Sequence, residues 1–125
     1  MDEAYLTDRE MDAMKILWER GSGTVAEILD RFPDPVAYTT VLWLLQTLEE
    51  KGHVTHRKEG RAFRYFPRVA EESVKRGAVG RLMDRAFDGS AERLLAHLVA
   101  RRLSPEELER MRKLLDEKLS EMEEG

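Results

Sequence analysis

The sequence predicts a mostly α-helical chain with a small β-hairpin, divided into residues 1–68 and residues 69–125. Two capping sequences and one stretch with apolar residues at helical spacing predict three short helices before Gly52. After Gly52 apolar and polar residues alternate, which is typical of strands, and beyond Pro67 the helical spacing returns. Three helices followed by a hairpin predict a winged helix-turn-helix domain, and the rest of the chain predicts a separate helical region.

The composition predicts a globular protein. Of the 125 residues, 42% are hydrophobic and 37% are charged, and no apolar run is long enough to cross a bilayer. The N-terminal sequence MDEAYLTDRE lacks the basic and apolar regions of a secretory signal, so we expect a cytoplasmic protein without a membrane partner. The absence of cysteine agrees with a reducing compartment and excludes disulfides and thiolate metal sites.

The first two helices are predicted by capping boxes, in which a threonine hydroxyl accepts from an amide three residues on and a glutamate reaches back. The pairs are Thr7 with Glu10 and Thr24 with Glu27. The first helix should run to about Arg20, with Trp18 as a core anchor, and end at Gly21-Ser22-Gly23. The second should run to Phe32, where Pro33 and Pro35 stop it.

The third helix is predicted from about Tyr38 to Lys51. Its core face follows the i, i+3, i+4, i+7 spacing with Val41, Leu44, Leu45 and Leu48. Its outward face holds hydroxyls, an amide and an aromatic ring, which suit base edges and phosphates: Thr39, Thr40, Trp43, Gln46, Thr47 and Glu50. On spacing alone an ordinary amphipathic core helix is favoured, and the neighbouring residues raise the alternative of a helix that reads DNA.

The hairpin is expected to pair about Val54–Arg57 with Ala62–Phe66 through a turn at residues 58–61. Residues 35–68 carry six basic and three acidic side chains, although the whole chain has a formal charge of −4. A local excess of cations attracts phosphate, and the alternative is a solvated face without a ligand. Because Phe63 and Tyr65 alternate with Arg64, one side of the hairpin should pack while the other presents cations.

The region after Pro67 predicts helices over about Val69–Phe87, through Leu94–Val99, and from the cap at Ser104 onward. This amphipathic chain is too short to bury its own apolar faces, so we expect a homodimer; the alternative is packing back onto the first domain. The residues predicted to form the dimer contact are Val74, Leu82, Phe87, Leu94, Leu98, Leu108, Met111, Leu115 and Met122.

Five consecutive blocks of the sequence resemble the penicillinase and methicillin-resistance repressors of the BlaI/MecI type, to which the copper-responsive CopY repressors also belong. The blocks are LTDREMDAMKILWERGSGTVAEI, AYTTVLWLLQTLEEKGHV, GRAFRYFP, FDGSAERLLAHLV and LSPEELERMRKLL. The resemblance implies a homodimeric repressor that binds double-stranded DNA at an inverted-repeat operator. It implies further that residues 1–68 form a winged-helix DNA-binding domain and residues 69–125 a helical dimerisation region.

The resemblance also implies roles for particular residues. The helix matching Tyr38–Lys51 would enter the major groove, and the hairpin matching Arg57–Arg64 would be the wing. Together with the outward face described above, this predicts a set of DNA-binding residues, namely Tyr38, Thr39, Thr40, Trp43, Gln46, Thr47, Arg57, Lys58, Arg61 and Arg64.

Three positions depart from the family pattern. Trp43 stands where the family usually has a small hydroxyl residue, so either the base sequence that is read differs or the ring packs against its own wing. Relatives cleaved by an upstream sensor protease carry an Asn-Phe pair near the block that holds His97-Leu98, and the absence of asparagine argues against such cleavage here. The C-terminal cysteines with which CopY-type members sense metal are missing.

The rival interpretation is a winged-helix protein-interaction module, in which the acidic N-terminal segment and Trp43 serve a protein partner. An enzyme is not expected, because His53, His56 and His97 form no catalytic or metal-ligand motif, and we expect no cofactor. Weak metal binding by His53 and His56 is left as an alternative that a zinc titration would test.

Overall fold

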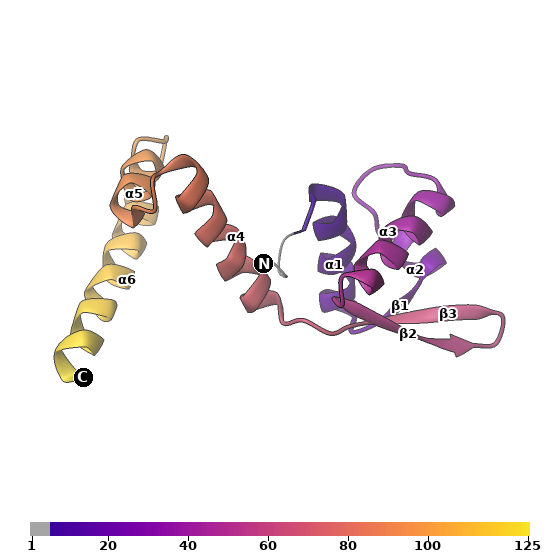
Figure 1. Ribbon diagram of the computed structural model, residues 1–125. Coiled ribbons are helices and arrows are strands. Elements are labelled where there is room, and N and C mark those ends of the chain that lie inside the picture. The colour runs from indigo at the N-terminus through magenta and orange to yellow at the C-terminus, as the bar shows by residue number, and fades with distance from the viewer. Residues whose placement is uncertain (1–5) are drawn as a thin grey trace. The chain divides into compact units, whose positions relative to one another are not determined.

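The computed structural model describes residues 6–125 and confirms a mostly helical chain with one small antiparallel sheet (Figure 1). It has two compact units, residues 1–81 and residues 82–125. The elements of the first unit, with α4 continuing into the second, are α1 (Asp8–Arg20), β1 (Gly23–Thr24), α2 (Val25–Asp30), α3 (Tyr38–Glu50), β2 (Val54–Glu59), β3 (Ala62–Pro67) and α4 (Glu71–Ala86). The second unit contains α5 (Ala91–Val99) and α6 (Pro105–Glu124).

The helix starts follow the capping chemistry that the sequence predicts. Thr7 and Thr24 each accept from the amide of a glutamate three residues on, and that glutamate accepts from the threonine amide, so both capping boxes are formed. Ser104 caps α6 in the same way, by accepting from the amide of Glu107. Gly21 ends α1 with a φ of 90°, a left-handed conformation that favours glycine. The second helix ends at Asp30, slightly before the predicted end at Phe32.

The core of the first unit is formed by α1, α2, α3, the sheet and the start of α4. The predicted inner face of α3 is buried, with Val41, Leu44, Leu45 and Leu48 at most 3% exposed. Helix α1 adds a broad apolar face that includes Met14 and Leu17, and Tyr65 comes from β3. Trp18 packs partly buried against this cluster, as predicted, and its indole Nε1 donates to the carbonyl of Val69 at 2.9 Å.

The sheet has the strand order β1-β3-β2, with both neighbouring pairs antiparallel. The hairpin strands are longer than predicted, because pairing runs from Val54↔Pro67 to Glu59↔Ala62. The short strand β1 lies where the sequence predicts the end of a turn. Its residues Gly23 and Thr24 pair with Tyr65 and Arg64 of β3. Position 23 of this strand favours glycine, because a Cβ there would lie 3.0 Å from Ile28 Cγ1. The hairpin tip extends beyond β1, so it has no third strand beside it (Figure 1).

The division between the units lies inside α4, later than the predicted boundary after residue 68. The start of α4 belongs to the first unit because Val74 is fully buried in its core. In the second unit α5 and α6 contain no buried residue, and their apolar side chains are partly or largely exposed. Within residues 6–125, no helix is long and apolar enough to span a bilayer.

Candidate nucleic-acid interface

The outward face of α3 is open to solvent. Thr39, Thr40, Gln46 and Glu50 are exposed, and Thr47 is half-buried. Trp43 lies among them with 62% of its surface exposed. A ring this exposed is not packed against the hairpin, which removes one of the two explanations that the sequence left open for this residue. The face therefore presents hydroxyls, an amide and an indole, which are groups that can contact base edges.

A groove of about 450 Å³ separates α3 from the hairpin. It places two of the predicted DNA-binding residues of α3, Tyr38 and Gln46, opposite Arg61 of the hairpin turn. The complete lining is Thr24, Val25, Ala26, Tyr38, Leu42, Gln46, Glu49, His56, Arg61, Ala62, Phe63 and Tyr65. The groove therefore brings Tyr38 and Gln46 of α3 and Arg61 of the hairpin onto one surface, whereas Trp43, Arg57 and Lys58 do not line it.

The hairpin presents cations that are open to solvent. Arg57, Lys58 and Arg61 are exposed and form no ion pair with another residue in the part of the chain that the structure describes. The guanidinium of Arg57 lies over the Phe66 ring, 4.5 Å from its centroid, which leaves its N–H groups available at the edge. These three side chains are therefore able to meet phosphates.

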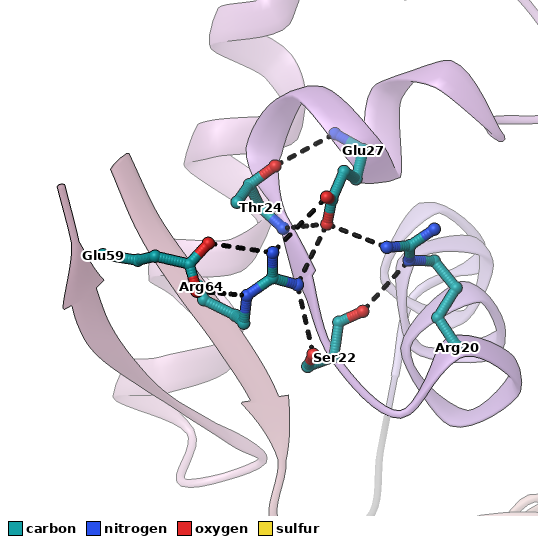
Figure 2. Close-up of polar contacts among 6 residues, drawn as sticks. All are labelled: Arg20, Ser22, Thr24, Glu27, Glu59 and Arg64. Atoms are coloured by element: carbon teal, nitrogen blue, oxygen red, sulfur yellow. Dashed lines mark hydrogen bonds and ion pairs between the residues drawn. The ribbon is translucent and has the colours of Figure 1, made fainter. Parts of the chain in front are cut away.

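Arg64 and Lys51, which belong to the same basic stretch of sequence, are in a different state. The Arg64 guanidinium pairs with Glu27 at 3.0 Å and with Glu59 at 2.9 Å (Figure 2). The Lys51 ammonium pairs with the buried carboxylate of Glu10 at 2.8 Å. The sequence predicts an excess of positive charge over this stretch but does not reveal these acidic partners. Glu27 is 37 positions from Arg64, and Glu10 is 41 positions from Lys51.

Both ends of α3 are fastened to α1. At the N-terminal side, Arg9 forms a bidentate ion pair with Asp34 in the loop before α3. Its Nη1 and Nη2 donate to the two carboxylate oxygens at 2.7 and 2.6 Å. This pairing lowers the pKa of Asp34 and raises that of Arg9. At the C-terminal side, Lys51 follows the last residue of α3 and reaches Glu10. The core therefore fixes the position of the outward face, and the Lys51 pair with the buried Glu10 carboxylate adds to it.

The hairpin is fastened to α3 through His56. Its Nδ1 lies 2.7 and 2.8 Å from the two carboxylate oxygens of Glu49. The ring also meets Phe63 edge to face, with 4.7 Å between centroids, and lies 5.5 Å from Tyr65. Tyr65 is buried, as the predicted packing side requires, whereas Phe63 is 44% exposed at the groove. Burial is the main reason that the pKa of Tyr65 is raised.

The histidines do not gather into a metal site in the described structure. His53 is buried, and His97 lies on α5 with Nδ1 3.1 Å from the carbonyl of Arg93. Among residues 6–125, no group of three or more His, Asp or Glu side chains is placed to hold a metal ion. The acidic segment at residues 1–5, on which the protein-partner interpretation partly depends, lies outside the described residues.

The residues predicted for the dimer contact fall into two groups. Val74 is fully buried in the core of the first unit, so we remove it from the predicted contact. In the second unit, five predicted residues are between 41% and 67% exposed, namely Leu82, Leu98, Leu108, Leu115 and Met122. Phe87, Leu94 and Met111 are partly exposed, and the Phe87 ring meets His97 at 5.0 Å.

The chain is similar to known proteins over most of its length. Residues 6–117 match the family described as Penicillinase repressor. The chain is 25% identical over 115 residues to the penicillinase repressor of Bacillus licheniformis, with 90% of each chain covered. It is 33% identical over 117 residues to the transcriptional regulator BlaI of Mycobacterium tuberculosis, covering 90% of this chain and 83% of that one.

A solved structure matches about half of the chain. The solution structure of the DNA-binding domain of the repressor BlaI matches with a TM-score of 0.51 and 30% identity, covering 54% of this chain and 85% of that one. The match of the family over most of the chain confirms the resemblance to the BlaI/MecI repressors. The chain therefore belongs to the penicillinase repressor family.

Proposed function

We propose that this chain is a sequence-specific DNA-binding transcriptional repressor, which binds an inverted-repeat operator as a homodimer and acts by occupying a promoter. The observation that carries the proposal is the groove that brings Tyr38 and Gln46 of α3 together with the exposed cation Arg61 of the hairpin. Membership of the penicillinase repressor family and the likeness to the DNA-binding domain of BlaI support it.

The two parts of the surface have different chemistry. Exposed Arg57, Lys58 and Arg61 are suited to phosphates, which supply affinity without sequence preference. The side chains of α3 are suited to base edges in the major groove, where each base pair presents its own pattern of donors, acceptors and methyl groups. We propose that the hairpin supplies most of the salt-dependent affinity and that α3 supplies the specificity.

The dimer is proposed from the second unit. Its apolar side chains on α5 and α6 are partly or largely exposed, and a second copy would cover them. A symmetric dimer presents two α3 helices, so its operator is an inverted repeat. Because the chain contains no asparagine, the proposal includes no cleavage at an Asn-Phe pair by a sensor protease.

The proposal is tested by selecting bound duplexes from a random DNA pool and then titrating salt on the selected duplex. We expect an enriched inverted repeat and a steep loss of affinity with salt. Arg61→Ala should lower the slope of log K against log salt by about 2 for a dimer, since each lost phosphate contact contributes roughly 0.9. Arg110→Ala, which removes an exposed cation from α6, is the control and should leave the slope unchanged.

The second candidate function is a protein-interaction module, and the exposure of Trp43 is the observation in its favour. The same experiment separates the two functions. If no duplex is enriched from the pool while the protein is folded and dimeric, the DNA-binding proposal is wrong and the protein-partner interpretation replaces it. Enrichment of a duplex that Trp43→Ala no longer prefers assigns the exposed indole to base reading.

A further inference from the structure

Arg64 lies where the sheet meets the helix-turn-helix. In the strand register it stands opposite Thr24 of β1 on one side and opposite Arg57 of β2 on the other. Thr24 is also the N-cap of α2, the first helix of the helix-turn-helix pair. A side chain at this position can therefore contact both the start of α2 and the hairpin.

All five N–H groups of the Arg64 guanidinium are used in this structure (Figure 2). Nε and one Nη2 hydrogen donate to the two oxygens of Glu59, at 2.9 and 3.0 Å. Nη1 donates to Glu27 at 3.0 Å and to the Ser22 hydroxyl at 3.2 Å, and Nη2 reaches the second Glu27 oxygen at 3.4 Å. A phosphate could bind Arg64 only by displacing one of these acceptors.

Glu27 connects this guanidinium to the helices. The same oxygen that accepts from Arg64 also accepts from the Thr24 amide at 3.1 Å, as part of the capping box, and from Arg20 of α1 at 2.9 Å. One carboxylate thus joins the end of α1, the start of α2 and the middle of β3. Figure 2 shows Glu27 between the two guanidinium groups.

The cluster is charge-balanced, with two guanidinium groups and two carboxylates. The pKa of Glu27 is lowered, mainly by the Thr24 amide and then by Arg64, and the pKa of Glu59 is lowered mainly by Arg64. Both carboxylates are therefore charged at neutral pH. Unlike Arg61 at the tip, Arg64 adds no net attraction for DNA, because its charge is cancelled locally.

We propose that Arg64 is a positioning residue, which holds the hairpin at a fixed place relative to α2 by bridging Glu27 and Glu59, and that it does not contact phosphate. The hairpin needs such a bridge because β1 pairs only with Tyr65 and Arg64, so the strands beyond that point have no other support from the sheet. Together with the His56–Glu49 contact, the bridge sets where Arg57, Lys58 and Arg61 stand relative to the outward face of α3.

The first test uses amide hydrogen exchange and requires no DNA. The variants are Arg64→Gln and Glu27→Gln, because glutamine at position 27 can still complete the capping box. Each should speed exchange of the hairpin amides, residues 57–64, by about fivefold to tenfold, and the double variant should exchange no faster than either. Arg20→Gln is the matched control, since Arg20 pairs with the same Glu27 oxygen from α1 and should leave hairpin exchange unchanged.

Exchange at the parent rate in Arg64→Gln would overturn the positioning role. So would additive effects in the double variant, because they would mean that Arg64 and Glu27 act independently. These outcomes concern the fold of the hairpin, and they stand whether or not the chain binds DNA.

The second test rests on the proposed function and measures the salt slope on the selected duplex. Arg64→Gln should weaken binding without changing the slope, and Glu27→Gln should weaken binding similarly although it removes a negative charge. Arg61→Gln should lower the slope by about 2 in a dimer. A slope lowered equally by Arg64→Gln would show a phosphate contact and overturn the inference, whereas absence of binding by the parent protein would overturn the proposed function and leave the exchange result intact.

Discussion

The indole Nε1 of Trp18 donates a hydrogen bond of 2.9 Å to the main-chain carbonyl of Val69, and so ties α1 to the segment that leads into α4. A few residues later Val74 enters the core of the first unit and is fully buried. The first turns of α4 therefore belong to the winged domain, and a boundary drawn after Arg68 would cut through its packing.

Val74→Ala tests this boundary. We expect the substitution to lower the free energy of unfolding by about 2 kcal/mol, the usual cost of removing buried methyl groups from a core. Val79→Ala on the same helix is the control, since Val79 is 50% exposed and its loss should change stability by less than about 0.5 kcal/mol. Urea titration followed by circular dichroism measures both. Equal stabilities of the two variants would contradict the core role, and weakened dimerisation of Val74→Ala alone would return Val74 to the dimer contact.

Leu115→Ala tests the proposed dimer. Leu115 is 51% exposed in one chain and shares a face of α6 with Leu108, Met111 and Met122. If a second copy covers this face, Leu115→Ala removes roughly 1.5–3 kcal/mol of apolar burial from each protomer of the dimer. The dimer dissociation constant should therefore rise at least about tenfold. Glu117→Ala, on the opposite side of α6, should leave it unchanged. Sedimentation velocity over a range of concentrations measures the constant, and a parent protein that is monomeric at micromolar concentration would rule the dimer out.

The features that the sequence predicted correctly depend on residues close together in the chain. The capping boxes at Thr7 and Thr24 span four residues each, and the buried face of α3 follows from a spacing of three and four. Local chemistry of this kind acts before the tertiary structure forms, so it can be deduced from the sequence. The outward face of α3 could be predicted for the same reason, as the complement of its buried face.

The features that the sequence did not reveal depend on distant partners. Strand β1 has two residues and exists because Tyr65 and Arg64 lie beside it. Arg64 and Arg61 are arginines of the same basic stretch of sequence. Of the two, only Arg64 is ion-paired with Glu27, which lies 37 positions away in the chain. Val74 has the same helical spacing as the exposed apolar residues that follow it, and only the path of the chain decides that it is buried. Spacing identifies which residues share a face, but not what that face meets.

The Glu10–Lys51 pair should make the stability of the first unit depend on acidity. Burial alone would raise the pKa of Glu10, but hydrogen bonds from Lys51 and from Thr7 outweigh it and lower the pKa below the ordinary value of 4.5. A folded pKa below the unfolded one means that the stabilisation is complete at pH above about 5 and is lost as the pH falls through the folded value. The free energy of unfolding should therefore fall as the pH is lowered from 5.

Glu10→Gln should lower stability at neutral pH by about 2 kcal/mol, because it removes the buried negative charge that pairs with the Lys51 ammonium, while glutamine can still complete the first capping box. Below pH 4 the difference between variant and parent should shrink, since the parent carboxylate is then being protonated. Glu50→Gln, an exposed position on α3, serves as the control and should follow the parent at every pH. Urea titrations at several pH values measure this, and a difference that stays constant down to pH 3 would contradict the assigned pKa shift.

Trp43→Ala should change which DNA sequence is selected without changing stability. The side chain is 62% exposed, so its removal opens no cavity, and the free energy of unfolding should stay within about 0.5 kcal/mol of the parent. Leu44→Ala, at the neighbouring buried position, is the contrast and should cost roughly 2–5 kcal/mol. In selection from a random pool, the variant should lose discrimination of about 1–3 kcal/mol at one or two base pairs in each half-site. Because the indole is uncharged, the salt slope should remain that of the parent. A variant that selects the parent operator with unchanged discrimination would show that the indole does not read bases, and the specificity of α3 would then rest on its hydroxyl and amide side chains.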